Sequence, residues 1–130
     1  GGDKGWVDLA PPVSVEEDEE RLKEAGMEVK EGRVWKGKES LAMSRAFGDW
    51  LFKAEEGGGG GVSVEKTVTK IPEDWTWIVV ACDGLWDVVK AEDCTEMMEG
   101  DPVEVADKLT REAIWKGSED NVTVVVIRRE

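Results

Sequence analysis

The sequence contains no histidine, no tyrosine and only two cysteines among its 130 residues. The absence of histidine excludes three kinds of site within this chain: a histidine-dependent catalytic triad, a histidine-ligated zinc site and a histidine general acid. Two cysteines are too few for a disulfide framework. No apolar run approaches the roughly 18–20 residues of a membrane span, and no signal-peptide pattern opens the chain. We therefore expect a soluble, intracellular protein with reduced cysteines and no membrane span.

Basic residues are also few, because 17 Lys and Arg stand against 30 Asp and Glu and give a net charge of −13. A nucleic-acid-binding domain needs a basic face for the phosphate backbone, so this charge predicts no nucleic-acid partner. The chain is 40% hydrophobic and contains seven tryptophans, which is enough apolar material for a modest core. Its length is that of one ordinary domain.

The first part of the chain predicts a short helix and extended segments. Ser14 and Glu17 have the spacing of a capping box, so we expect a helix from about residue 15 to residue 25 that ends at Gly26. Residues 41–49 have no clean period and predict a structured loop with a helical turn. Extended segments are expected at residues 4–9, at 27–29 and at 33–35, the last two being joined by Glu31-Gly32.

Five consecutive glycines occupy positions 57–61. They lack the Lys-Ser/Thr pair and the strand-to-helix context of a phosphate-binding loop, so we interpret them as a flexible insertion.

The second part of the chain is more regular. Val62, Val64 and Val68 alternate with polar residues and predict a strand. Residues 75–82 are apolar almost throughout, as in a strand buried on both faces. Helices are expected over about 90–99 and from Pro102 to a point before Gly117, the second capped by Asp101, and a last strand is expected over 121–127. This mixture indicates an α+β or α/β layered domain.

Two acidic positions carry the strongest indication of a site. Asp83 follows the apolar strand directly and precedes Gly84, so its carboxylate lies at the edge of a core, where a divalent cation would compensate its charge. The alternative is an aspartate that caps the turn after the strand. Asp120 lies in a polar loop, residues 118–121, which by itself predicts an Asx turn.

Other polar features have simpler interpretations. Arg45 has the chemistry to bind phosphate, but an isolated arginine is more often a structural ion-pair partner. The acidic run 16–20 lacks the spaced ligands of a calcium loop and predicts a solvated helix face. Cys82 is expected to be a small core residue rather than a nucleophile. Most tryptophans are expected to pack in the core. For Trp35, Trp50 and Trp115 the alternative is a place on the surface, where each would anchor a partner.

Three motifs, in this order, resemble those of the metal-dependent protein serine/threonine phosphatases of type 2C. They are Leu-Ala-Met-Ser-Arg-Ala-Phe-Gly-Asp (41–49), Val-Ala-Cys-Asp-Gly-Leu-Trp-Asp-Val (80–88) and Gly-Ser-Glu-Asp-Asn-Val-Thr-Val-Val (117–125). The resemblance implies an α+β fold, a layered α-β-β-α sandwich with antiparallel sheets. It also implies two Mg²⁺ or Mn²⁺ ions that activate a water for attack on a phosphoserine or phosphothreonine. By the same resemblance, Asp83 and Asp120 are metal ligands.

The sequence also departs from that family. The Asp-Gly-His-Gly-Gly motif, which carries the first metal ligands, is absent. Residues 1–130 therefore resemble the C-terminal half of the catalytic domain, with the glycine-rich insertion at 57–61, and we expect the chain to be inactive by itself. One interpretation is part of a phosphatase acting on a phosphoprotein substrate and completed by a complementing chain. A second is a non-catalytic pseudophosphatase subunit that binds or assembles within a larger complex. A third is a redesigned fragment.

Overall fold

The computed structural model describes residues 5–53 and 61–130 and contains helices together with antiparallel sheets, so its fold class is α+β as expected. The chain divides into two compact units. The first-half unit covers residues 10–69, and the second-half unit covers residues 70–130 together with the segment before Ala10. Each unit has its own apolar core. No helix in the described ranges is long and apolar enough to cross a membrane.

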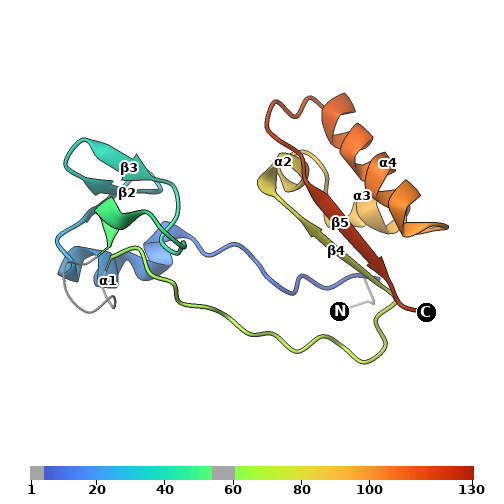
Figure 1. Ribbon diagram of the computed structural model, residues 1–130, viewed down its shortest axis with the longest axis horizontal. Coiled ribbons are helices and arrows are strands. Elements are labelled where there is room, and N and C mark those ends of the chain that lie inside the picture. Colours follow the sequence, from blue (N-terminus) through green and yellow to red (C-terminus); the bar gives the residue numbers. More distant parts are fainter. Residues whose placement is uncertain (1–4, 54–60) are drawn as a thin grey trace. The chain divides into compact units, whose positions relative to one another are not determined.

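The first-half unit begins with the expected helix in two pieces (Figure 1). The 3₁₀ turn η1 (Val15–Asp18) continues into α1 (Glu19–Glu24). Ser14 Oγ accepts a hydrogen bond from the Glu17 N–H at 3.4 Å, which confirms the predicted cap. Gly26 follows the helix with a φ of +81°, a left-handed value that favours glycine at a helix end.

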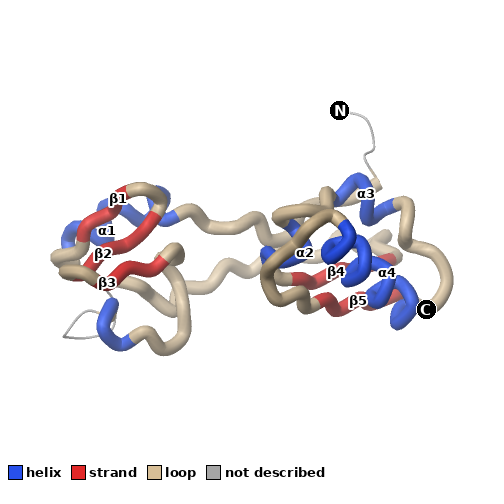
Figure 2. Tube along the Cα trace, turned by 90° about the horizontal axis from the view of Figure 1, so that it is seen from above, coloured by secondary structure: helices blue, strands red, loops and turns tan. Residues whose placement is uncertain are grey.

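A three-stranded antiparallel sheet packs against this helix, in the order β1 (Glu28–Lys30), β2 (Arg33–Lys36) and β3 (Glu39–Leu41) (Figure 2). Glu31 and Gly32 both have positive φ, as a two-residue hairpin turn requires, so the two extended segments are joined through these residues as predicted and form a hairpin. The 3₁₀ turn η2 (Trp50–Phe52) follows the loop after β3. The core of the unit consists of six buried side chains: Val15, Leu22, Met27, Val34, Phe52 and Val62.

The second-half unit is a two-stranded antiparallel ribbon covered by helices. The strands are β4 (Trp77–Ala81) and β5 (Val124–Arg128), and the helices are α2 (Asp83–Trp86), α3 (Ala91–Thr95) and α4 (Pro102–Trp115). Helix α4 lies along one face of the ribbon (Figure 1). Asp101 caps α4 by accepting from the Val103 N–H at 2.8 Å, and Pro102 occupies the first turn, as predicted. Gly117 follows the helix with a φ of +90°.

Strand β4 is not buried on both faces, so that prediction was wrong. Trp77, Val79 and Ala81 pack into the core on the α4 side. The opposite side carries Val80, which is 57% exposed, because the described residues provide helices on one face of the ribbon only. Val125 of β5 is its cross-strand partner on that open face and is 51% exposed.

Four other expected elements differ from the structure. Residues 5–9 form no strand and pair with no sheet in the described chain. The expected strand around Val62 is reduced to isolated bridges at Gly61 and Ser63, because nothing in the described chain pairs with the residues that follow. Helix α3 is shorter than the expected 90–99, and β5 begins at Val124 because residues 121–123 belong to a loop. The glycine run lies outside the described residues except for Gly61, where a Cβ would come within 2.4 Å of the Phe52 carbonyl oxygen.

Candidate functional site

Asp83 lies where β4 ends and α2 begins. Strand β4 stops at Ala81, Cys82 has an extended backbone, and Asp83 is the first residue of α2. The apolar residues of β4 fix the strand against the core, so this short connection presents Asp83 at the end of the ribbon, where its side chain is exposed.

The loop of residues 118–121 returns beside α2, although 34 positions of sequence separate Ser118 from Gly84 (Figure 1). Ser118 Oγ donates a hydrogen bond to the Gly84 carbonyl oxygen at 2.7 Å. Cys82 Sγ donates to the Asn121 carbonyl oxygen at 3.2 Å and accepts from the Thr123 N–H at 3.2 Å. Cys82 therefore links the two segments, and it is half-buried and lies outside the apolar core cluster in which it was expected.

Gly84 permits the closest approach between the two segments. A Cβ at this position would lie 2.0 Å from the Asn121 carbonyl oxygen, a distance that no side chain can tolerate. Since Asp83 precedes Gly84 and Asp120 precedes Asn121, this contact brings the two predicted metal ligands to the same end of the second-half unit.

The hydrogen bond that the structure gives Asp120 joins it to the next residue, whereas the expected Asx turn requires the residue two positions on. Asp120 Oδ1 accepts from the Asn121 N–H at 2.7 Å, while the side chain remains exposed. Within the described ranges, neither Asp120 nor Asp83 forms an ion pair with a lysine or arginine, so both carboxylates keep oxygen atoms available.

These two aspartates match Mg²⁺ or Mn²⁺ in the kind of ligand, since both ions prefer carboxylate oxygens. They do not match in number. In the part of the chain that the structure describes, no group of three or more His, Cys, Asp or Glu side chains is placed to hold a metal ion. The remaining ligands of a cation here would be water or groups outside the described residues.

Asp87 adds a further exposed carboxylate near this end, which the sequence interpretation did not single out. Its N–H donates to the Asp83 carbonyl oxygen at 2.9 Å, so the two aspartates are one helical turn apart. The sequence indicates this arrangement through the i, i+4 spacing of Asp83 and Asp87, because residues four positions apart lie on one side of a helix.

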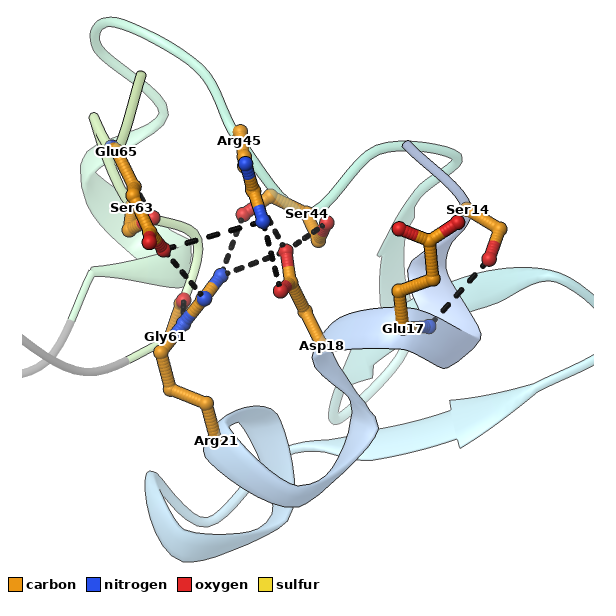
Figure 3. Close-up of polar contacts among 9 residues, drawn as sticks. All are labelled: Ser14, Glu17, Asp18, Arg21, Ser44, Arg45, Gly61, Ser63 and Glu65. Carbon is orange, nitrogen blue, oxygen red and sulfur yellow. Dashed lines mark hydrogen bonds and ion pairs between the residues drawn. The ribbon is translucent and has the colours of Figure 1, made fainter. Parts of the chain in front are cut away.

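Arg45 is an ion-pair partner, one of the two alternatives that its sequence context left open. Arg45 Nε and Nη2 donate to the two carboxylate oxygens of Asp18 at 3.1 and 3.2 Å (Figure 3). Arg21 Nη2 donates to the same carboxylate at 3.0 Å, and Ser44 Oγ donates at 2.6 Å. Glu65, which is 58% exposed, pairs with Arg21 at 3.2 Å on the outer side of this group. We call these five residues the Asp18 cluster.

Asp18 corrects the interpretation of the acidic run as a wholly solvated face, because its side chain is only 7% exposed. Burial by itself would raise the pKa of Asp18. The hydrogen bonds from Arg45, Ser44 and Arg21 outweigh burial and hold the pKa of Asp18 well below its usual range. The missed signal is position: Asp18 lies between Val15 and Leu22 on the buried stripe of the helix.

The candidate surface tryptophans behave differently from one another. Trp115, at the end of α4, is 82% exposed. Trp35 is half-buried and donates from Nε1 to the Lys30 carbonyl oxygen at 3.3 Å. The side chain of Trp50 lies outside the described residues. Only Trp115 is therefore shown to be free of the core.

Comparison of this sequence with known proteins finds protein phosphatases, both by family model and by individual relatives. The family model of protein phosphatase 2C matches residues 12–122. The chain is 38% identical over 130 residues to probable protein phosphatase 2C 71 of Arabidopsis thaliana, covering 98% of this chain and 28% of that protein. It is 38% identical over 122 residues to protein phosphatase 1B of Mus musculus, covering 85% of this chain and 30% of that protein. The chain spans about a third of the length of the curated relatives it matches.

Proposed function

Because this chain belongs to the protein phosphatase 2C family, we propose that it forms the C-terminal part of the catalytic domain of a phosphoprotein phosphatase. The enzyme would hydrolyse phosphoserine or phosphothreonine with Mg²⁺ or Mn²⁺ as cofactor. Asp83 and Asp120 would be metal ligands. The observation that carries this assignment is the Gly84–Asn121 contact, because it brings the two aspartates to one end of the second-half unit.

The residues of this chain would hold and orient the reacting groups. The carboxylates of Asp83 and Asp120 would bind cations through hard oxygen atoms, and the short connection after β4 would fix the first of them. A bound divalent cation supplies an activated water and stabilises charge on the phosphoryl group. The chain has no histidine, so proton transfer to the leaving oxygen would not come from a histidine of residues 1–130.

A second candidate is a non-catalytic subunit that binds or assembles within a larger complex. It is favoured by the small number of ligands, since the described residues contain no group of three metal-binding side chains. In this case Asp83 and Asp120 would form at most a weak cation site.

A complementation assay distinguishes the two candidates. The chain would be tested for hydrolysis of a phosphothreonine peptide with millimolar Mn²⁺, alone and mixed with the preceding segment of a matching phosphatase 2C relative. We expect no turnover by the chain alone, because two carboxylates do not complete a two-metal site. We expect turnover in the mixture that is lost in Asp83→Asn and Asp120→Asn.

Glu119→Gln is the matched control, because it removes the same charge from the same exposed loop. Turnover that persists in Asp83→Asn would overturn the ligand assignment. Turnover in none of the mixtures would favour the non-catalytic subunit.

A further inference from the structure

Helix α4 carries an exposed stripe on the side that faces away from the core of its unit. The helix is held to that core by three fully buried side chains, Val105, Leu109 and Ala113. At about 3.6 residues per turn, the opposite side of the helix carries Val103, Asp107, Arg111 and Ile114. Val103 is 77% exposed and Ile114 is 62% exposed, with the exposed Trp115 next to Ile114. The stripe therefore has apolar side chains at both ends of the helix and charged side chains in its middle.

The charged middle of this stripe can bind a further partner. Arg111 Nε donates to Asp107 Oδ2 at 2.8 Å, and the two side chains are 78% and 60% exposed. In the described part of the chain, the Nη groups of Arg111 and the second oxygen of Asp107 form no other ion pair or hydrogen bond. An exposed pair within one helix contributes little to stability. Each of these two groups can therefore pair with an opposite charge from another molecule.

The stripe is also complementary to itself. Asp107 and Arg111 lie two positions before and two positions after Leu109, while Val103 lies six positions before it and Ile114 five positions after it. If a second α4 lies antiparallel to the first with the two Leu109 positions level, Asp107 of each helix is opposite Arg111 of the other. Val103 of each helix is then opposite Ile114 of the other. A surface on which residue i meets residue j, and j meets i, is what a twofold symmetric dimer requires.

We propose that this stripe of α4 binds a second copy of the chain through antiparallel packing of the two helices. A partner with one sign of charge would match either Asp107 or Arg111, whereas a second copy matches both. The net charge of −13 on each copy opposes association. At about 0.15 M salt, however, exposed charges more than about 8 Å apart are largely screened, while pairs buried at a contact are screened much less. A helix of 14 residues forms a short interface, so the dimer is weak, with a dissociation constant on the order of 100 µM.

Charge reversal tests the proposed pairs in the full chain. Arg111→Asp places two carboxylates against each other at both contacts, and Asp107→Arg places two guanidinium groups there. Sedimentation velocity over about 10 µM to 1 mM should show dimers of the wild-type chain, and the dissociation constant of each variant alone should rise by about tenfold or more. Lys70→Asp and Glu73→Arg are the matched controls, because they make the same charge changes in an exposed ion pair outside α4. Both controls should dimerise as the wild-type chain does.

Mixing the two variants gives the sharpest test of the geometry. In an equimolar mixture of Arg111→Asp and Asp107→Arg chains, a dimer of unlike chains has opposite charges at both contacts, so we expect association close to that of the wild-type chain. Thermal unfolding of each variant shows whether it is folded. Ile114→Ala keeps both charges and should weaken the dimer several-fold, so it tests the same surface even if a charge variant fails to fold.

Three results would overturn the proposal. The first is a wild-type chain that stays monomeric up to about 1 mM. The second is a dimer that neither charge reversal nor Ile114→Ala weakens, because such a dimer uses another surface, such as the open face of β4 and β5. The third is a mixture of the two folded charge variants that stays as dissociated as each variant alone.

Discussion

Removal of the buried charge of Asp18 should destabilise the first-half unit. Asp18 receives hydrogen bonds from Arg21, Ser44 and Arg45, so its carboxylate holds α1 to the loop after β3. Arg21 also donates to the Gly61 carbonyl oxygen at 3.2 Å, which connects the same centre to the segment beyond the glycine run. In Asp18→Asn, an amide N–H₂ replaces one carboxylate oxygen and faces arginine donors.

The size of the effect follows from the exposure of the partners. Removing one member of a buried ion pair costs about 3–5 kcal/mol, because the other charge remains without compensation. Arg21 and Arg45 are 22% and 24% exposed, so water replaces part of the lost interaction and we expect about 3 kcal/mol. At roughly 0.05–0.15 kcal/mol per residue, a unit spanning residues 10–69 has only a few kcal/mol of stability to lose.

Amide hydrogen exchange can measure this loss within each unit. A loss of about 3 kcal/mol corresponds to roughly 100-fold faster exchange of the protected amides in β1–β3. Amides of β4 and β5 should exchange as in the wild-type chain, because they belong to the other unit. The control is Glu65→Gln, which removes the exposed acid of the same cluster and should cost less than about 1 kcal/mol. Unchanged exchange in β1–β3 of Asp18→Asn would show that the buried carboxylate does not stabilise this unit.

Three further predictions concern pH, thiol reactivity and packing. Since the pKa of Asp18 is lowered on folding, its contribution to stability is complete above the unfolded value of about 3.9 and is lost as the pH falls through the folded pKa. When the pH is lowered, amide hydrogen exchange should thus detect unfolding first in β1–β3. Asp18→Asn should make the stability of this unit less dependent on pH, and an identical pH profile in both proteins would contradict the prediction. Cys94 is buried, and burial, together with the charge of Asp93, raises its pKa to about 11, so iodoacetamide at pH 8 should leave it unmodified until the unit unfolds. Rapid native-state labelling of Cys94, located by peptide mass spectrometry, would show that the helix packing is wrong. Leu109→Ala removes a fully buried side chain of α4 and should cost about 2–5 kcal/mol in urea unfolding, whereas Val103→Ala, at 77% exposure, should cost less than about 1 kcal/mol; equal costs would reject the assigned face.

Local signals predicted the elements that depend on local chemistry. The cap at Ser14, the turn at Glu31-Gly32 and the Asp101-Pro102 start of α4 were readable because each uses a residue type with a specific backbone role. The strand expected around Val62 failed for the opposite reason. The alternation of apolar and polar residues indicates which side chains share one face of a strand, but it does not provide a partner strand. The described chain offers no partner after Ser63.

The candidate site was predictable only in part. Asp83 and Asp120 could be identified from their motifs, but not the contacts of Gly84 and Ser118 that bring them together, because these join distant segments. Asp18 was hidden within a run of acids, and only its place on the buried stripe distinguishes it. The matched relatives are about three times as long as this chain, and the first metal motif of the family is absent from residues 1–130.

Paramagnetic broadening by Mn²⁺ can decide whether Asp83 and Asp120 bind a divalent cation together, as we propose. In a ¹H–¹⁵N spectrum of the chain, micromolar Mn²⁺ should selectively broaden the amide signals of residues 83–84 and 119–121, and excess Mg²⁺ should restore them. Glu119→Gln should retain this pattern, and Asp83→Asn should lose it. Uniform broadening along the acidic surface, or broadening at residues 83–84 that persists in Asp83→Asn, would contradict the claim.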